Sequence, residues 1–498
     1  MFTSRKTKIA RAGVRALFLA ALTLGAVPGA AQTVMVYQGA QWTAERRDAF
    51  YTQDQGSRLM PIAWMRALKQ SDGNAFLSDS LERYGYLPNP AGGEGDLPVG
   101  FTVADGANGR TVGMTCSACH TRQIEVGGAS YRIDGGPAIV DFQSFLRDTS
   151  DAVQAVLATA EAFDAFASSV LGSGASDTQK QTLKLEVETW QLRFGTLIER
   201  SLPDPAWGPS RLDAVSMIFN RLAGLDLGEP PTYLIAENIA TADAPARYPF
   251  LWNAAVQDKT QWPGFADNGN SLLALSRNLG EVYGVFAEFH PVKQSGLLRL
   301  NRDYISNNSA NFGGLHALED LVWKIGPPVW PWALDHELAA EGRAIYNRGT
   351  DQGGCVDCHG IRTGAFRSPL HRTWATPIQD VGTDSRECGV LTRTVKTGVM
   401  EGAKISFPKV IDIEIKATDT AFNLLTISVL GAILQNTLSF PGRGAGRGGR
   451  DGYAGTPGGV RLSLRGVSCT RHGGNDGVGN GCWHCLATIG LRLRGAGA

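Results

Sequence analysis

The sequence carries no net charge, because its 47 lysines and arginines balance its 47 aspartates and glutamates. No global field therefore favours nucleic acid or an anionic membrane surface as a partner. Cysteine is scarce, with eight residues among 498, and half of them fall into two units of identical spacing. A chain of this length predicts two or three domains with room for buried cores.

A long, purely apolar stretch of the kind that spans a membrane is also missing. The apolar run 16–27 is short for a span of about 20 residues. Basic residues precede it and the small residues 28–31 follow it, which is the layout of a secretory signal peptide cleaved after Ala31. An uncleaved anchor is the alternative. The second apolar run, 421–438, contains six polar side chains that would be costly in lipid, so it predicts a buried core helix. We expect an exported protein, periplasmic or secreted, with no stable membrane span.

Two C-x-x-C-H units are the strongest chemical signal in the sequence. They read CSACH at 116–120 and CVDCH at 355–359. This spacing is typical of c-type haem attachment, in which two cysteines bond the vinyl groups of one haem and the histidine ligates its iron. The sequence thus predicts two covalently attached haem c groups. The attachment cysteines are Cys116, Cys119, Cys355 and Cys358, and the proximal iron ligands are His120 and His359.

Zinc binding, thiol redox chemistry and chance are the alternatives for these units. Zinc needs further ligands at suitable spacing, and a redox C-x-x-C is typical of a βαβ context that the sequence does not indicate. A third pair, Cys482 and Cys485, is followed by Leu486 rather than by histidine, so it predicts no third haem. With Cys469 nearby, a disulfide, a metal site and an incidental origin remain open for it.

The second axial ligand of each iron has several candidates. A downstream methionine or histidine is usual in electron-transfer haems, whereas an open position favours binding of O₂ or peroxide. Met400, 41 residues after His359, is the candidate distal ligand of the second iron, with His371 as its rival. For the first iron the candidates are no ligand at all, Met217, His290 and His316.

Two arginines and two tryptophans are further site candidates. Arg132 and Arg277 offer planar donors to a haem propionate or a distal oxygen ligand, with a surface salt bridge as the alternative. Trp252 and Trp262 are candidates for carrying electrons between the haems, with plain aromatic packing as the alternative. Of these we take Arg277 and Trp252 as candidate catalytic residues.

Helical periodicity dominates the sequence, and strand signals are few. Residues 201–270 are rich in proline and aromatic residues, and they predict a long loop of the kind that often carries function. The predicted fold class is mainly α, with two cytochrome c-like haem domains and long loop-rich connections. The main predicted helices cover 141–170, 177–200, 271–289, 315–324 and 334–349, the last of which leads into the second haem unit.

The last 58 residues, from Pro441 onward, differ sharply from the rest. They contain 18 glycines and 8 arginines but neither lysine nor glutamate. A segment without core-forming periodicity cannot offset its ordering entropy, so this one predicts disorder. A basic interaction tail and a reading-frame shift in a GC-rich gene are the alternatives.

Three stretches resemble bacterial dihaem c-type cytochromes of the peroxidase-like superfamily. They are MTCSACHTRQIEVGGASYRIDGGPAIVDF, ALSRNLGEVYGVF and RAIYNRGTDQGGCVDCHG. Segment 381–403 is similar to the larger branch of this superfamily, which includes the rubber oxygenases. The separation of 235 residues between Cys119 and Cys355 also resembles that branch. The resemblance covers about residues 75–440. The chain lacks the PYLHNGS-like segment whose histidine ligates the C-terminal haem in relatives.

The resemblance implies that one haem is the reactive centre and that the other exchanges electrons. In the rubber-oxygenase branch the N-terminal haem binds oxygen, which would make the haem at Cys116 and Cys119 the reactive one here. We expect an exported haem-dependent oxidoreductase that passes electrons between two haems and reduces peroxide or activates O₂ at the first. A rubber-oxygenase-like dioxygenase, a non-catalytic electron-transfer cytochrome and a binding module are the alternatives. Expected partners are a redox protein or small electron donor, and peroxide, O₂ or an organic substrate.

These expectations divide the chain into four segments. They are a signal peptide at 1–31, an N-terminal haem domain with a helical and loop insertion at 32–325, a C-terminal cytochrome c-like haem domain at 326–440, and the glycine- and arginine-rich tail at 441–498.

Overall fold

A computed structural model describes the chain from Thr33 onward, with gaps. The expected signal peptide lies outside the described residues, as do Trp262 and much of the tail. The described residues are 33–90, 92, 94, 97–107, 109–261, 263–297, 300–359, 362–368, 371–375, 385–407, 411–439, 460–470 and 484–493.

Helices hold more of the described chain than strands do, but strands are more frequent than the sequence predicted. They form small sheets of two to four strands, and most strands are too short to give a recognisable alternation of apolar and polar residues. The fold is therefore mixed, with helix predominating. The helices are α1 Ala44–Thr52, α2 Ile62–Ala67, α3 Cys116–Cys119, α4 Phe142–Leu157, α5 Ala160–Leu171, α6 Asp177–Ser201, α7 Ala214–Leu225, α8 Ser271–Gly284, α9 Phe312–Val322, α10 His336–Tyr346, α11 Val356–His359, α12 Arg386–Thr392 and α13 Ala421–Ser439.

Three of the sheets bear on the candidate sites. The first C-x-x-C-H unit lies along the chain between β4 of the sheet β2-β4-β3 and β5 of the sheet β1-β6-β5. Strand β8 of the pair β7-β8 ends two residues before Pro249, whose carbonyl oxygen lies 2.8 Å from His120 Nδ1. The strands of the described chain are β1 Thr33–Met35, β2 Met60–Pro61, β3 Phe101–Gly106, β4 Gly109–Met114, β5 Thr121–Val126, β6 Ala129–Asp134, β7 Arg211–Leu212, β8 Ala246–Arg247, β9 Lys259–Thr260, β10 Ala266–Asp267, β11 Val292–Leu297, β12 Leu300–Asp303, β13 Arg362–Ser368, β14 His371–Ala375, β15 Thr394–Lys396, β16 Lys404–Phe407, β17 Ile411–Glu414, β18 Thr418–Thr420, β19 Val460–Thr470 and β20 His484–Leu493.

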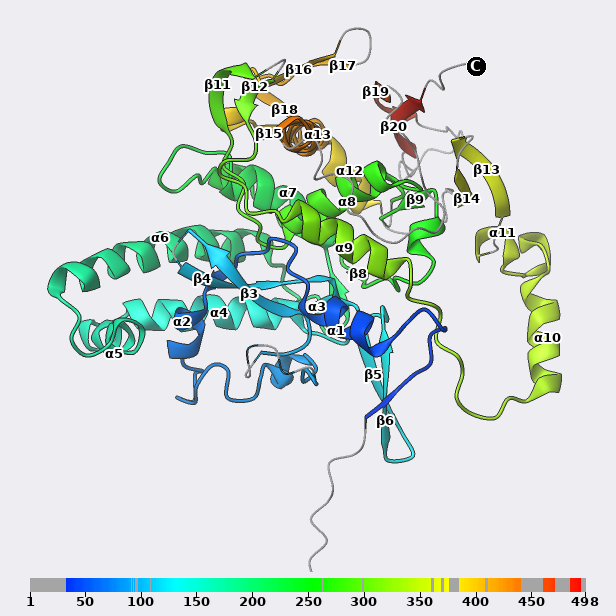
Figure 1. The fold of residues 1–498 in the computed structure, drawn as a ribbon, viewed down its shortest axis with the longest axis horizontal. Coiled ribbons are helices and arrows are strands. Elements are labelled where there is room, and N and C mark those ends of the chain that lie inside the picture. Colours follow the sequence, from blue (N-terminus) through cyan, green and yellow to red (C-terminus); the bar gives the residue numbers. More distant parts are fainter. Residues whose placement is uncertain are drawn as a thin grey trace, which may run out of the picture.

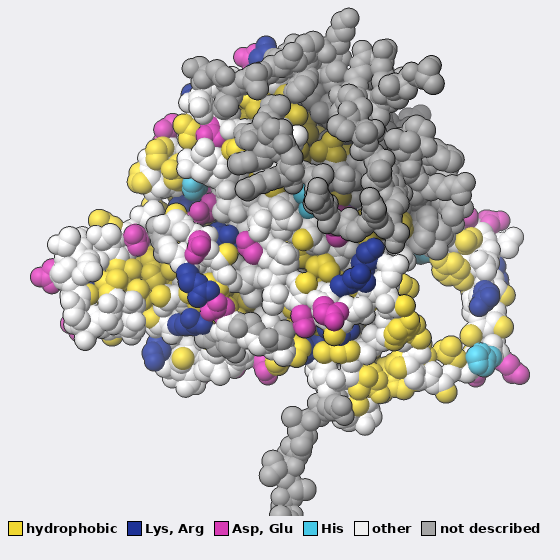
Figure 2. All heavy atoms as spheres, in the orientation of Figure 1, with side chains coloured by type: hydrophobic (Ala, Val, Ile, Leu, Met, Phe, Trp, Pro, Cys, Tyr) yellow, Lys and Arg dark blue, Asp and Glu magenta, His cyan; other side chains and the backbone are white. Residues whose placement is uncertain are grey.

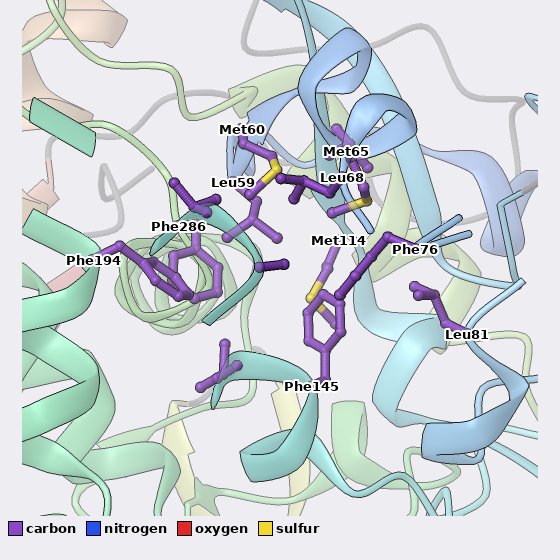
Figure 3. Close-up of a cluster of buried hydrophobic side chains, with 14 of the residues drawn as sticks. Leu59, Met60, Met65, Leu68, Phe76, Leu81, Met114, Phe145, Phe194 and Phe286 are labelled. Carbon is purple, nitrogen blue, oxygen red and sulfur yellow. The ribbon is translucent and has the colours of Figure 1, made fainter. Parts of the chain in front are cut away.

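Helices α4, α5 and α6 extend together to one side of the molecule (Figure 1). The helix predicted over 141–170 is in fact two helices, because the Thr159 side chain accepts from the N–H of Ala162 and begins a new helix there. The second predicted helix is confirmed as α6, which Ser176 and Gln179 begin with a reciprocal capping box. Their buried faces join strands β2 and β4 in one apolar cluster, in which Phe145, Met60 and Met114 converge (Figure 3).

Helix α7 lies inside the segment that was predicted to be a loop. Every residue from Val215 to Leu225 is buried, and the prolines that favoured a loop lie before and after this helix rather than within it. It packs with α8, α12 and α13 in a second apolar cluster that runs from Val215 to Ile433. Residues 391–433 therefore share a core with residues 215–315. The expected boundary at 325 does not coincide with a boundary between these packed cores.

Helix α13 confirms the prediction of a core helix over 421–438. Leu424, Ile427 and Ala432 have no exposed surface, and the hydroxyl of Ser428 donates to the Leu424 carbonyl oxygen at 2.8 Å. None of the helices in the described ranges is long and apolar enough to cross a membrane.

Helices α10 and α11 form an arm at one side of the molecule (Figure 1). No residue of α10 is buried. Its large apolar side chains are exposed instead, and hydrophobic side chains also gather along the chain that leads to it (Figure 2). The exposed large apolar residues of α10 and of the chain that leads to it are Val329, Trp330, Leu334, Leu338, Ile345 and Tyr346.

Part of the tail has regular structure, which differs from the expectation of disorder. Strands β19 and β20 pair antiparallel, and their register sets Cys469 opposite Cys485. Cys482 and residues 440–459 lie outside the described residues. The reading-frame hypothesis stays a prediction.

Candidate functional site

The first C-x-x-C-H unit, called the first unit below, forms a single helical turn, α3, between strands β4 and β5. The turn is closed by the His120 N–H, which donates to the Cys116 carbonyl oxygen at 3.0 Å. Gly100 packs against it so closely that a Cβ at this position would lie 2.1 Å from the Ala118 nitrogen. Only glycine permits this approach, which fixes the turn on the β3–β4 sheet.

The His120 ring is oriented by a backbone carbonyl from a distant segment. Its Nδ1 lies 2.8 Å from the Pro249 carbonyl oxygen. Because a carbonyl can only accept, Nδ1 carries the hydrogen and Nε2 carries the lone pair. The Tyr248 ring meets the imidazole edge-on, with centroids 6.3 Å apart. Burial lowers the pKa of His120 to about 4, so the ring is neutral and able to ligate a metal at ordinary pH.

Cys116 and Cys119 form no disulfide. Burial raises the pKa of each thiol to about 12, and Glu281 and Glu319 add to the effect at Cys116. Reactive redox cysteines have lowered pKa values instead, because the thiolate is the nucleophile. No group of three or more His, Cys, Asp or Glu side chains in the described ranges is placed to hold a metal ion. The raised thiol pKa values argue against the thiol-redox alternative, and the zinc alternative stays open.

Trp252 lies close to the first unit. It packs with Cys116 against an apolar cluster that includes Val99, Leu318 and Ile325. Its ring also stacks on Phe250, with centroids 4.8 Å apart and planes 11° apart. The position suits a wall of the first site, and the expectation that Trp252 lies between two haems stays a prediction.

Arg277 on α8 is held by fixed partners. Its Nη2 donates to Glu319 Oε2 at 2.5 Å and its Nη1 to Asn268 Oδ1 at 2.7 Å. Asn278 also donates to Glu319, at 3.1 Å. The guanidinium therefore ties α8 to α9, and its charge reaches Cys116. We infer that Arg277 acts as a positioning residue beside the first site.

Glu281, one turn after Arg277, is the titratable group that the sequence analysis missed. Gln261 donates to its Oε1 at 2.6 Å. Burial raises the pKa of Glu281, although the positive charge of Arg277 opposes this. Its charge in turn raises the pKa of Cys116, which places the carboxylate in the neighbourhood of the first unit.

The remaining arginine and the first-iron ligand candidates have different surroundings. Arg132 is buried and donates to Gln123 and to the Pro88 carbonyl oxygen, which gives it a structural role in the β5–β6 hairpin. Met217 is buried in the first apolar cluster. His290 stacks on Tyr233, at 3.7 Å between centroids.

His316 is the remaining candidate ligand of the first iron. It is partly buried and precedes Glu319 by three residues on α9, so both side chains lie on one side of the helix. Because Glu319 influences Cys116, this side of α9 faces the first unit. His316 as a ligand of the first iron stays a prediction.

The second C-x-x-C-H unit differs from the first in its hydrogen bonds and in its exposure to solvent. The Cys355 N–H donates to the Tyr346 carbonyl oxygen at 3.1 Å, and the Tyr346 hydroxyl donates to the His359 carbonyl oxygen at 2.5 Å. These bonds join α10 to α11. Cys355 and His359 are exposed, and of the Cys358 side chain the structure describes nothing.

Of the two candidate ligands of the second iron, the structure describes the side chain of Met400 and only the backbone of His371. Met400 has no exposed surface and packs in the second apolar cluster with Leu391, Ala403 and Ile405. His371 begins β14, opposite Ser368. The arrangement gives Met400 a core position, and a ligand role would require it to leave that cluster.

Comparison with known proteins adds little about activity. No protein-family profile matches the chain. A protein of Sinorhizobium fredii (strain NBRC 101917 / NGR234), described as uncharacterized protein y4iJ, is 30% identical over 356 residues. The match covers 64% of this chain and 56% of the relative, so the chain spans little more than half the length of the curated relative.

Proposed function

We propose that the chain is an exported c-type cytochrome that holds one haem at residues 116–120 and a second at residues 355–359. The observation that carries the proposal is the His120–Pro249 hydrogen bond, in a unit whose two thiols are uncrosslinked and neutral. Metal-ligating histidines typically donate their other ring N–H to a carbonyl or carboxylate. The bond fixes the ring and leaves Nε2 as the ligand atom.

The residues of the first unit fit a covalently bound haem. Cys116 and Cys119 would form the two thioether bonds, and His120 would be the proximal ligand. A bound haem supplies one-electron chemistry and an iron coordination position for a small ligand.

The neighbouring side chains would enclose and orient this centre. Leu251 and Trp252 pack in the same cluster as Cys116 and exclude water on that side. Arg277 fixes α8 against α9 through Glu319, and so sets the position of Glu281. The pKa of Glu281 is raised by burial, which favours its protonated form relative to an ordinary carboxyl and would suit it to donate a proton at the first site.

The second unit fits a haem with a different task. Leu338, Ile345 and Tyr346 offer exposed apolar surface directly before Cys355, and burying such surface stabilises a protein by about 25 cal/mol per Å². An attached haem would cover it. An exposed site suits exchange of electrons, whereas an enclosed site suits chemistry that must exclude water. We therefore assign peroxide reduction or O₂ activation to the first unit and electron relay to the second.

Spectroscopy of cysteine variants tests the proposal. The purified chain should show haem c absorbance and a mass increase of two haem groups. Cys116→Ser/Cys119→Ser and Cys355→Ser/Cys358→Ser should each lose one group, while Cys388→Ser, outside both units, should lose none. A native chain without covalent haem would sink the proposal.

Adding carbon monoxide to the reduced protein and cyanide to the oxidised protein separates the possible activities. Uptake that disappears in Cys116→Ser/Cys119→Ser supports a reactive first centre. If neither haem takes up a ligand, the chain is an electron carrier. A rubber-oxygenase-like activity would require in addition a stable O₂ adduct at the first unit, which the same spectra report.

A further inference from the structure

A pocket of about 260 Å³ opens where three segments of the chain meet. Its lining consists of residues 38–41 before α1, residues 253, 255 and 256, and residues 322–326 at the end of α9. None of the described residues that line it is acidic. The volume is at the small end for a ligand site, so the pocket suits a small molecule rather than a polymer.

Hydrogen bonds fix the walls of this pocket. The Gly326 N–H donates to the Gln38 carbonyl oxygen at 3.1 Å, and the Gln38 side chain donates back to the Gly326 carbonyl oxygen at 3.0 Å. A Cβ at residue 326 would lie 2.3 Å from the Gln38 carbonyl oxygen, so only glycine permits this contact. On the other wall, Asn268 donates to the Ala254 carbonyl oxygen at 2.8 Å. The pocket therefore has a defined shape before any ligand binds.

Four of the lining side chains are available to a ligand. Within the described part of the chain, the side chains of Gln41, Asn253 and Lys324 make no hydrogen bond or ion pair. The Trp323 side chain is 51% exposed. Amide groups both donate to and accept from hydroxyls, and an indole presents a face on which another aromatic ring can stack. Together these groups suit a small aromatic molecule that carries hydroxyls.

The end of helix α9 narrows the choice of ligand. The last carbonyl groups of a helix carry partial negative charge and accept hydrogen bonds, so a neutral hydroxyl suits residues 322–326 better than a carboxylate does. The Lys324 ammonium group would attract the electron-rich face of an aromatic ring. A catechol, which has two adjacent hydroxyls on one flat ring, combines the features that these groups recognise.

The pocket borders the apolar cluster that contains Cys116. Ile325 belongs to both the pocket lining and this cluster. Trp42 and Trp252 also pack in the cluster, and each of them is next to a lining residue in the chain. The Trp42 indole N–H donates to Asp134 Oδ2 at 2.7 Å, which fixes the ring. A molecule in the pocket would therefore contact the same cluster that contacts the first unit.

We propose that this pocket binds a small catechol-type reductant, which supplies electrons to the first haem after peroxide has oxidised it. The inference rests on the proposed function and names the class of its small electron donor. One catechol loses two electrons and the protons of its two O–H groups, and becomes an ortho-quinone. Hydrogen peroxide takes up both electrons and both protons, its O–O bond breaks, and two waters form.

Isothermal titration calorimetry with catechol tests the pocket. The haem-loaded chain is used without oxygen and with cyanide present, so that catechol cannot bind the iron instead. Trp323→Leu should weaken catechol binding about fivefold or more because stacking is lost, and Lys324→Gln should weaken it about twofold to fivefold. Trp330→Leu changes another exposed tryptophan, outside the lining, and should bind as the native chain does. Cyclohexane-1,2-diol, which has the hydroxyls without the aromatic ring, should bind about tenfold more weakly than catechol.

Stopped-flow spectroscopy after one equivalent of peroxide measures electron donation. The rate at which the resting spectrum returns should rise with catechol concentration and then level off, with a half-saturating concentration that matches the calorimetric dissociation constant. Trp323→Leu should raise this concentration and leave the limiting rate within about twofold of native, because it removes binding rather than chemistry. Hexaammineruthenium(II), which donates an electron without needing the pocket, should act equally on the native chain and the variant. Lys324→Gln takes the place of Trp323→Leu if that variant fails to fold.

The outcomes separate the two proposals. A chain without covalent haem overturns the proposed function, and the donor role of catechol with it. A haem-loaded chain that reacts with peroxide but does not bind catechol, or binds it equally in Trp323→Leu and Lys324→Gln, overturns this inference alone. A return rate that keeps rising linearly well above the dissociation constant also overturns it, because catechol would then react by collision rather than from the pocket.

Discussion

His120 and Pro249 are separated by 129 residues in the chain, yet His120 Nδ1 lies 2.8 Å from the Pro249 carbonyl oxygen. This bond joins the first C-x-x-C-H unit to the proline-rich middle of the chain. The middle segment therefore has a structural role, because it holds the His120 imidazole in one tautomer and one orientation.

The ligand role of His120 can be separated from its structural role. We expect His120→Ala to keep both thioether bonds but to lose the native visible spectrum of the first haem, because the proximal ligand is missing. Added imidazole should restore the spectrum in part by occupying the space of the ring. His290→Ala, which removes a histidine stacked on Tyr233, is the matched control and should leave the spectrum unchanged. A native spectrum in His120→Ala without imidazole would contradict the assignment.

Substitutions of Met400 distinguish a role in core packing from a role as an iron ligand. As a fully buried core residue, it should tolerate Met400→Leu at a cost below about 1.5 kcal/mol in the free energy of unfolding. Met400→Ala should cost about 2–5 kcal/mol. Urea unfolding measures both values, and the visible spectrum should stay native in Met400→Leu. A changed spectrum with unchanged stability would restore methionine ligation.

The Arg277–Glu319 pair predicts a stability effect at the first site. Both side chains are about nine-tenths buried, so Arg277→Ala would leave Glu319 buried without its cation, at a cost of about 3–5 kcal/mol. The double variant Arg277→Met/Glu319→Leu should lose much less, because no charge is left unpaired. Arg277→Met and Glu319→Leu, measured singly and together by urea unfolding, form a double-mutant cycle that gives the coupling between the two residues. Equal losses in single and double variants would argue against a structural ion pair.

The exposed apolar side chains of the arm at α10 and α11 predict that a bound haem protects this segment from proteolysis. In Cys355→Ser/Cys358→Ser, chymotrypsin should cleave between Trp330 and Tyr346 faster than in the native haem-loaded chain, because the apolar side chains stay exposed. Cleavage near Leu171, beside the exposed loop 172–174, serves as the internal reference and should be equal in both. Equal cleavage of the arm would indicate that no haem covers it.

The sequence predicted local features well where the signal lies within a few residues. Ser176 and Gln179 mark the start of α6 by their spacing alone, and the polar residues of 421–438 correctly indicated a core helix rather than a membrane span. Helix α7 was missed because the segment around it is rich in proline and aromatic residues, although the prolines themselves lie outside Ala214–Leu225.

The sequence by itself predicts the attachment chemistry, because C-x-x-C-H brings two thiols and an imidazole together within five residues whatever the rest of the chain does. It could not place Met217, His290, Met400 and His316 in the fold, nor find Pro249 or Glu281. Those assignments depend on contacts between segments far apart in the chain. Only the tertiary structure gives these positions, because burial and long-range pairing determine which side chains lie at the site and which are packed in the core.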